Sequence, residues 1–348
     1  MTSTSSPKRP LHSLFFAILF FLALAGGLEG AARSSWAAGH LPRYRSFGND
    51  HYQFEIKWFG LERYVARHGG VDVLILGNSM ANTGVDPDVI TALYAEQTGR
   101  PVGVYNFGVE GLTLHGNLAL AALLLEEYQP EVLVFVADVR DLDDANLPNS
   151  EARLLSDPWV RYRLGEWTLA GWLFDHSQAL QVYLPYRNWV RADFPDTFYN
   201  YLYRAVTITE SGYEPDTNTI TLDEAALNEI RNSAACTQYY PQIEIGAGRL
   251  EELRALLALA NRHGARLIVA EMPVNPVVYE CMTGAVNRAD FQQAMTETLA
   301  PGGGIFLPAE PGLPVEAHID MHHLNRQGAA AFSRQLGLAL LGLYTPSR

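Results

Sequence analysis

Cysteine is scarce in this 348-residue chain, which holds only Cys236 and Cys281. Two isolated cysteines make no structural zinc site, because such a site needs four ligands at characteristic spacings. In an exported protein the pair could form one disulfide, and the alternative is two buried thiols. The acidic residues Asp138, Asp141, Asp143 and Asp144 could bind Ca²⁺, but we favour a solvated acidic loop and expect no metal and no organic cofactor.

Basic residues are also few. The chain carries 25 Lys and Arg against 38 Asp and Glu, a formal net charge of −13, and no basic run beyond Lys8 and Arg9. Because phosphate binding needs clustered Lys and Arg, we exclude nucleic acid as a partner. A phosphate loop is lacking too, since no Gly-Lys-Ser/Thr follows residues 77–84.

Polar residues are missing from one stretch near the N-terminus, about Leu14 to Leu28. The basic residues before it suit the cytoplasmic side of a membrane span, so the rest of the chain would be exported. Its length fits either a signal peptide or an uncleaved anchor within residues 1–32. Glu29 interrupts the small residues that a cleavage site needs, so we favour the anchor. A buried core helix is disfavoured, because such a helix rarely lacks a polar face.

Strands and helices alternate over much of the remaining chain. A connector over residues 33–69 ends in a predicted helix at 54–68. The apolar runs that predict buried parallel strands are 71–76, 102–107, 132–137 and 267–270. The predicted helices between and after them are 86–98, 115–128, 249–263 and 325–343. This order predicts an α/β domain over residues 70–348, with a parallel sheet covered on both faces by helices.

The alternation stops between about residues 146 and 245, which we interpret as an insertion or cap. Its pattern is mostly helical to about residue 204, and 207–221 suggests a hairpin or an extended loop. Its aromatic residues could form a sugar-binding platform. We favour the insertion's own core, because aromatic residues dominate core burial. They are Trp159, Trp167, Trp172, Tyr183, Tyr186, Trp189, Phe198, Tyr199, Tyr201 and Tyr203.

The first segment that could carry chemistry is Gly77-Asn78-Ser79, directly after the first predicted strand. In parallel sheets, ligands bind beyond the carboxyl ends of the strands, and a glycine-permitted turn there exposes the serine. Taken alone, the pattern is also typical of a helix N-cap. It is not the Gly-x-Ser-x-Gly elbow of α/β-hydrolases, because Ala81 replaces the last glycine.

The second segment pairs Asp320 with His323, just before the last predicted helix. In a first helical turn, a three-residue spacing puts both side chains on one face. The carboxylate can then fix the imidazole tautomer while the other ring nitrogen faces a nucleophile. His322 is an alternative base, but the spacing favours His323. Taken alone, the pair could be a capping carboxylate and a surface histidine.

The third segment, Asn106 to Gly111, follows the second predicted strand. Acyl transfer needs backbone N–H groups directed at a developing oxyanion, and glycine lets the backbone approach closely. The alternative is a tight strand-to-helix turn with no further role.

Together and in this order, the three segments resemble the SGNH (GDSL-type) hydrolase superfamily. Gly77-Asn78-Ser79 stands where many members have Gly-Asp-Ser, Gly111 matches the glycine of the second block, and Asp320-x-x-His323-Leu324-Asn325 matches the last block. The similarity covers about residues 70–140 and 250–345, which leaves the insertion unmatched. It implies a flavodoxin-like three-layer α/β/α SGNH fold, with Ser79 as nucleophile, His323 as base and Asp320 as its partner.

One block departs from the family's pattern. The third block normally supplies an Asn side chain to the oxyanion hole, but here the chain reads Asp138-Val139-Arg140-Asp141. A carboxylate cannot donate a hydrogen bond, whereas Arg140 could, and Asn146 is close in sequence. We expect the backbone N–H groups of Ser79 and Gly111 as oxyanion donors, with Arg140 as a weaker third candidate.

These roles predict a serine-dependent esterase or O-acyltransferase that hands an acyl group to water or to a sugar hydroxyl. The resemblance to membrane-tethered envelope-type members implies an extracytoplasmic acyl ester or polysaccharide substrate, with the protein membrane-anchored or secreted to the periplasm. The missing Asn motivates an alternative: a catalytically weak or inactive SGNH-like domain that binds glycan or scaffolds an envelope complex. A nucleotide-binding flavodoxin-like protein is disfavoured, because the phosphate loop is lacking.

Overall fold

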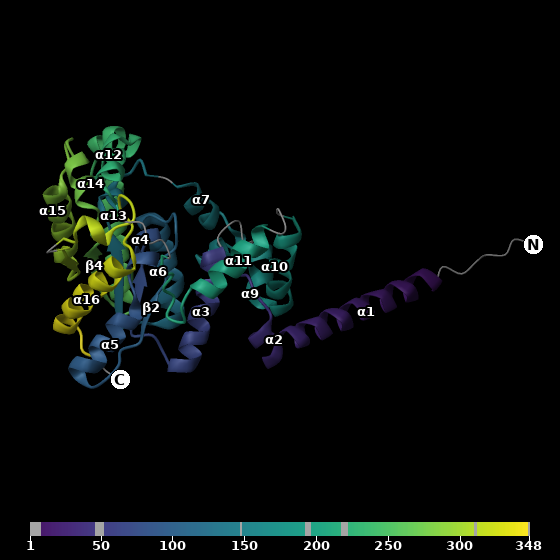
Figure 1. Ribbon diagram of the computed structural model, residues 1–348. Helices are drawn as coiled ribbons and strands as arrows, with labels where there is room; N and C mark the ends of the chain where they lie inside the picture. The colour runs from purple at the N-terminus through teal and green to yellow at the C-terminus, as the bar shows by residue number, and fades with distance from the viewer. Residues whose placement is uncertain are drawn as a thin grey trace, which may run out of the picture. The chain divides into compact units, whose positions relative to one another are not determined.

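The structure is a computed structural model that describes residues 8–45, 52–146, 148–191, 196–216, 222–309 and 312–346 (Figure 1). The chain divides into two compact units. The first comprises residues 1–48 and 157–197, and the second comprises residues 49–156 and 198–348.

A five-stranded parallel sheet forms the centre of the second unit. Its strands are β1 (Val73–Leu76), β2 (Val104–Asn106), β3 (Val132–Ala137), β4 (Arg266–Glu271) and β5 (Ile305–Leu307). They lie in the order β2-β1-β3-β4-β5, which is the strand order of flavodoxin-like folds. All the pairings are parallel, and Val73 lies opposite both Val104 and Val132. The predicted α/β fold with a parallel sheet is confirmed.

Helices cover both faces of this sheet. The chain passes from β1 to β2 in one direction and from β2 to β3 in the other, so right-handed crossovers place the connecting helices on opposite faces. On one face α4 (Ser79–Gly84), α5 (Pro87–Thr98) and α16 (Arg326–Leu343) pack together. On the other, α13 (Ala247–Arg262) packs against α6 (Leu114–Tyr128) and α15 (Arg288–Leu299). The three layers bury β1, β2 and β3 completely.

Strand β5 was not predicted from the sequence. It has only three residues, all half-buried, and it follows three consecutive glycines, so its apolar run is too short to predict a strand. Of the two alternatives for residues 207–221, a hairpin or an extended loop, the described residues show no hairpin. Helix α11 (Asp196–Thr207) ends where the hairpin would begin, and turns follow to residue 216. Residues 217–221 lie outside the described residues.

The second unit contains further short elements around the sheet. These are α3 (Tyr52–His68), η1 (Val139–Leu142), α7 (Asn149–Leu155), α12 (Glu224–Asn232), η2 (Ala235–Tyr239), η3 (Tyr240–Gln242), α14 (Pro276–Cys281), η4 (Ala300–Gly302) and η5 (Val315–Ala317). A disulfide joins Cys236 in η2 to Cys281 at the end of α14. It links the last part of the predicted insertion to the segment after β4.

The first unit is helical. It contains α1 (Lys8–Ala32), α2 (Ser35–His40), α8 (Pro158–Arg163), α9 (Leu169–His176) and α10 (Gln178–Arg191). Helix α1 leads away from α9 and α10 (Figure 1), and its segment His12–Ala32 is apolar and long enough to cross a membrane, as in signal anchors and signal sequences.

The aromatic residues of the predicted insertion do not form one core. Of the ten, only Trp159 and Trp189 are buried. Six are exposed: Trp167, Trp172, Tyr183, Tyr186, Tyr199 and Tyr203. The expectation of an insertion core was therefore wrong for most of them, because these short helices bury one side and leave the other open.

Candidate active site

Ser79 stands at the carboxyl end of β1, as the first residue of α4. Asn78 is the N-cap of this helix, and its side chain accepts a hydrogen bond from the Met80 N–H at 2.9 Å. Gly77 permits the sharp turn, since a Cβ there would lie 2.6 Å from the Ala81 Cβ and 2.9 Å from the Val136 oxygen. The capping role that the sequence left open for Ser79 thus belongs to Asn78.

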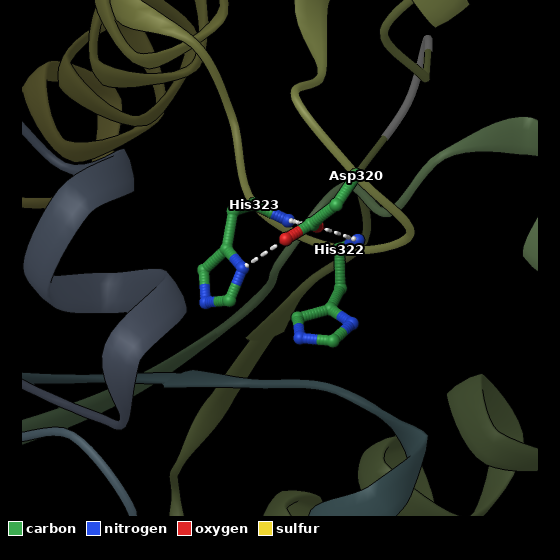
Figure 2. Close-up of side chains that lie close together, drawn as sticks. All are labelled: Asp320, His322 and His323. Atoms are coloured by element: carbon green, nitrogen blue, oxygen red, sulfur yellow. Dashed lines mark hydrogen bonds and ion pairs between the residues drawn. The ribbon is translucent and has the colours of Figure 1, made fainter. Parts of the chain in front are cut away.

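Asp320 and His323 lie in a bend before α16, not in a helical turn as expected (Figure 2). The bend is held by Asp320 itself, whose Oδ1 accepts the backbone N–H groups of His322 at 2.8 Å and His323 at 2.7 Å. The other carboxylate oxygen, Oδ2, lies 2.7 Å from His323 Nδ1. The three-residue spacing therefore brings the two side chains together through a side-chain-capped loop.

A chain of hydrogen bonds connects Asp320 to Ser79 through the imidazole. His323 Nε2 lies 2.9 Å from Ser79 Oγ. Burial alone would raise the pKa of Asp320, but the hydrogen bond and charge of His323 outweigh it and hold the pKa well below its usual value. The carboxylate is thus ionised and accepts the Nδ1–H, which leaves Nε2 free to accept the serine proton.

Three successive backbone N–H groups of the loop after β2 donate hydrogen bonds within the protein. Gly108 donates to Asn106 Oδ1 at 2.8 Å, Val109 donates to the Gly77 oxygen at 3.0 Å, and Glu110 donates to a glutamine side chain at 2.7 Å. For Gly111, the next residue, the described part of the chain offers no acceptor. That residue has φ +70° and packs against the Ser150 side chain, where a Cβ would lie 2.2 Å from Oγ.

The Ser79 N–H has no acceptor among the described residues either, as is usual for the first N–H groups of a helix. Because Val109 is bonded to the oxygen of Gly77, the Gly111 loop is tied to the turn that carries Ser79. Two unused backbone donors thus belong to two loops at the same edge of the sheet. An oxyanion hole requires such backbone donors to converge on one point.

Arg140, in η1 after β3, contacts the residue that follows Ser79. Its Nε donates to Asp138 Oδ2 at 2.7 Å, and its Nη2 lies 3.2 Å from the sulfur of Met80, the residue after Ser79. Burial would lower the pKa of Arg140, but Asp138 raises it, so the side chain is charged. Asn146 is not available as a donor to the site, because its side chain donates to the Arg140 carbonyl oxygen at 3.1 Å.

Sequence analysis missed two residues of α3 that hold the Gly111 loop. Lys57 is fully buried and its Nζ donates to the Gly108 oxygen at 2.6 Å, while Gln53 Oε1 accepts the Glu110 N–H. Burial lowers the pKa of Lys57 to about 7. The available signal was their spacing of four residues, which places both on the apolar stripe of α3 beside Trp58.

His322 is close to its neighbour but is not part of the hydrogen-bond chain. Burial, followed by the charge of Arg140, lowers its pKa to about 3, so its ring is neutral at physiological pH. The ligand atoms of Asp320, His322 and His323 lie within 4.8 Å of one another, which is a spacing that a metal ion could bridge. Both oxygens of Asp320 already accept hydrogen bonds from the bend and from His323, so a metal there would have to break them.

Comparison with known proteins gives little at the level of sequence. No family model matches the chain, and no curated protein matches it. Among solved structures, the chain is similar to a protein of Parabacteroides merdae that is described as a GDSL-like lipase, with 12% identity and a TM-score of 0.35. The alignment covers 79% of this chain and 98% of that one. A likeness at this level does not assign a family, so the function has to be argued from the residues.

Proposed function

We propose that this chain is a serine-dependent esterase or O-acyltransferase of the SGNH type, with Ser79 as nucleophile, His323 as general base and Asp320 as its orienting partner. The observation that carries the proposal is the continuous chain from Asp320 Oδ2 through the imidazole to Ser79 Oγ, with steps of 2.7 and 2.9 Å. A hydroxyl in contact with an oriented base is the arrangement that activates a serine.

In the first half of the reaction, Ser79 Oγ attacks the carbonyl carbon of an ester while His323 Nε2 takes the hydroxyl proton. The tetrahedral oxyanion is held by the backbone N–H groups of Ser79 and Gly111, with the charged Arg140 as a third donor. The imidazolium is stabilised by the ionised Asp320. It then protonates the departing alcohol, which leaves an acyl group on Ser79.

In the second half, His323 takes a proton from an acceptor hydroxyl, which attacks the acyl group. The imidazolium then returns the proton to Ser79 Oγ as the acyl–Oγ bond breaks, which regenerates the serine and the base. Water as acceptor gives hydrolysis, and a sugar hydroxyl gives acyl transfer. Lys57 and Gln53 act as positioning residues, because they hold the carbonyl and amide groups on either side of Val109 in the Gly111 loop.

We place this chemistry outside the cytoplasm, on an acyl ester of the cell envelope such as an acylated polysaccharide. The support is the apolar segment His12–Ala32, preceded by Lys8 and Arg9. Basic residues before such a segment stay on the cytoplasmic side, so the rest of the chain is translocated.

Turnover of short and long p-nitrophenyl esters by the full-length chain in detergent tests the proposal, beside the Ser79→Ala variant. An oligosaccharide acceptor is added to separate transfer from hydrolysis. We expect ester cleavage that disappears in the variant, with acylated sugar formed only if the protein is a transferase. A folded chain that cleaves none of the esters but binds the oligosaccharide would instead support the non-catalytic alternative.

A further inference from the structure

The end of α1 is fastened to the start of α10 within the first unit. Glu29 Oε1 accepts the Gln178 N–H at 2.9 Å, and Oε2 accepts the Ala179 N–H at 3.1 Å and the Ser177 hydroxyl at 2.8 Å. The carboxylate therefore caps the N-terminus of α10, where negative charge is stabilising. It is the same residue that interrupts the small side chains of a possible cleavage site.

Arg33 makes a second connection one turn further along. Its Nε donates to Glu29 at 2.7 Å, and its Nη2 donates to the carbonyl oxygen of His176 at the end of α9 at 3.0 Å. The last turns of α1 are thus bonded to the junction of α9 and α10. Proteolytic removal of α1 would leave α10 without its cap, so the geometry favours a retained anchor.

The position of Glu29 in the apolar segment indicates how deep the junction of α1, α9 and α10 would lie relative to a membrane. The 21-residue, mostly apolar segment His12–Ala32 forms a helix about 31 Å long, which matches the hydrocarbon thickness of a bilayer. Glu29 lies about 4–5 Å inside the end of that segment. A carboxylate inside the hydrocarbon is costly, so Glu29 and the groups of α10 that bind it are best placed at the membrane surface, near the end of the span.

Large apolar side chains are exposed around the same junction. On α9, Leu169, Trp172 and Leu173 share one face and are 57%, 41% and 38% exposed. Trp172 stacks on the ring of His176, whose carbonyl oxygen accepts from Arg33. On α2, Trp36 is 62% exposed. We call Trp36, Leu169, Trp172 and Leu173 the exit patch.

The two units also differ in net charge, and the difference favours contact of the first unit with the membrane. Residues 29–48 and 157–197, which would lie at or beyond the membrane exit, carry seven Lys or Arg against six Asp or Glu. Residues 49–156 and 198–348 carry sixteen against thirty-two. An anionic lipid surface would therefore repel the second unit and leave the first unit free to approach.

We propose that α1 is retained and that the exit patch lies in the headgroup region of the bilayer that α1 spans. The first unit would then contact the membrane surface where α1 leaves the bilayer. Trp side chains favour this region because the indole ring is largely apolar while its N–H group can form a hydrogen bond with water or lipid headgroups. The proposal rests on the membrane anchoring proposed above, and it is independent of the chemistry of Ser79.

The test uses the full-length chain reconstituted into phosphatidylcholine–phosphatidylglycerol vesicles, with and without lipids brominated near the headgroup end of the acyl chains. Bromine quenches tryptophan fluorescence only at short range. The quenched emission is compared between wild type, the Trp36→Phe and Trp172→Phe variants, the double variant that carries both changes, and the Trp58→Phe variant. Trp58 serves as the control, because it is fully buried in the second unit. The intact mass of the membrane-extracted protein reports whether α1 is retained.

We expect an intact chain whose quenched emission falls by about half or more when Trp36 and Trp172 are both replaced, and is unchanged by Trp58→Phe. An intact, membrane-bound chain whose emission is not quenched would overturn the docking of the exit patch but leave the anchor standing. If emission shifted only on addition of oligosaccharide, the patch would bind glycan instead of lipid. A mature chain that lacks α1 would overturn the whole proposal.

Discussion

Replacing Asp320 by Asn tests the role of the carboxylate, because the structure fixes how the new side chain must lie. The backbone N–H groups of His322 and His323 both point at Oδ1, at 2.8 and 2.7 Å. The amide oxygen of Asn is the only group that can accept them, so its NH2 must face His323 Nδ1. The imidazole then has to accept at Nδ1 and carry its proton on Nε2, where it cannot take the proton of Ser79.

We therefore expect Asp320→Asn to lower kcat by about 10⁴-fold at neutral pH, equivalent to about 5.4 kcal/mol, with little change in KM or in melting temperature. Steady-state hydrolysis of p-nitrophenyl acetate between pH 6 and 10 measures this, beside His322→Gln as a neighbouring variant outside the hydrogen-bond chain. Activity of the Asn variant should rise with pH as hydroxide takes over the base's role. A loss below about tenfold would refute the assigned tautomer.

Three further changes have defined outcomes. Lys57→Met removes a lysine whose pKa is about 7 when folded and about 10.4 when unfolded. As the pH rises from 7 to 9, the folded wild type loses this proton while the unfolded chain keeps it. The free energy of unfolding of the wild type should therefore rise by about 2 kcal/mol relative to that of the Met variant, as measured by denaturant unfolding. If both free energies changed equally with pH, the burial of Lys57 would be contradicted. Arg140→Gln should lower kcat about 100-fold with KM nearly unchanged if Arg140 is the third oxyanion donor, and an unaltered kcat would remove it from the site. Replacing Cys236 and Cys281 by Ser opens a 45-residue loop and should cost about 4 kcal/mol of unfolding free energy, whereas no shift in the denaturation midpoint would show that the disulfide adds nothing.

Four of the five strands could be predicted because they are largely apolar runs flanked by glycine or proline. The serine and the Gly111 loop could be placed at one edge for the same reason, since each directly follows such a run. The bend that joins Asp320 to His323 was misassigned as helical, because a three-residue spacing suits both a helical turn and a loop whose Asp caps its own backbone.

What the sequence did not predict depends on contacts between distant segments. Lys57 meets the Gly108 carbonyl across 51 residues, and Glu29 meets α10 across 149, so neither pair has a local pattern. The aromatic residues were assigned to a core from composition alone, and composition does not say which side of a short helix will be covered. Local periodicity thus predicted the strand ends, whereas the side chains that hold the loops after them could be identified only from the structure.

The most direct measurement is labelling of the full-length chain in detergent with a fluorophosphonate, followed by mass spectrometry of its peptides. Only a serine activated by a base reacts at an appreciable rate. We predict stoichiometric modification of Ser79, abolished in Ser79→Ala and slowed strongly in Asp320→Asn. A well-folded chain that stays unlabelled, or that is labelled at another serine, would contradict the assignment of Ser79 as the nucleophile.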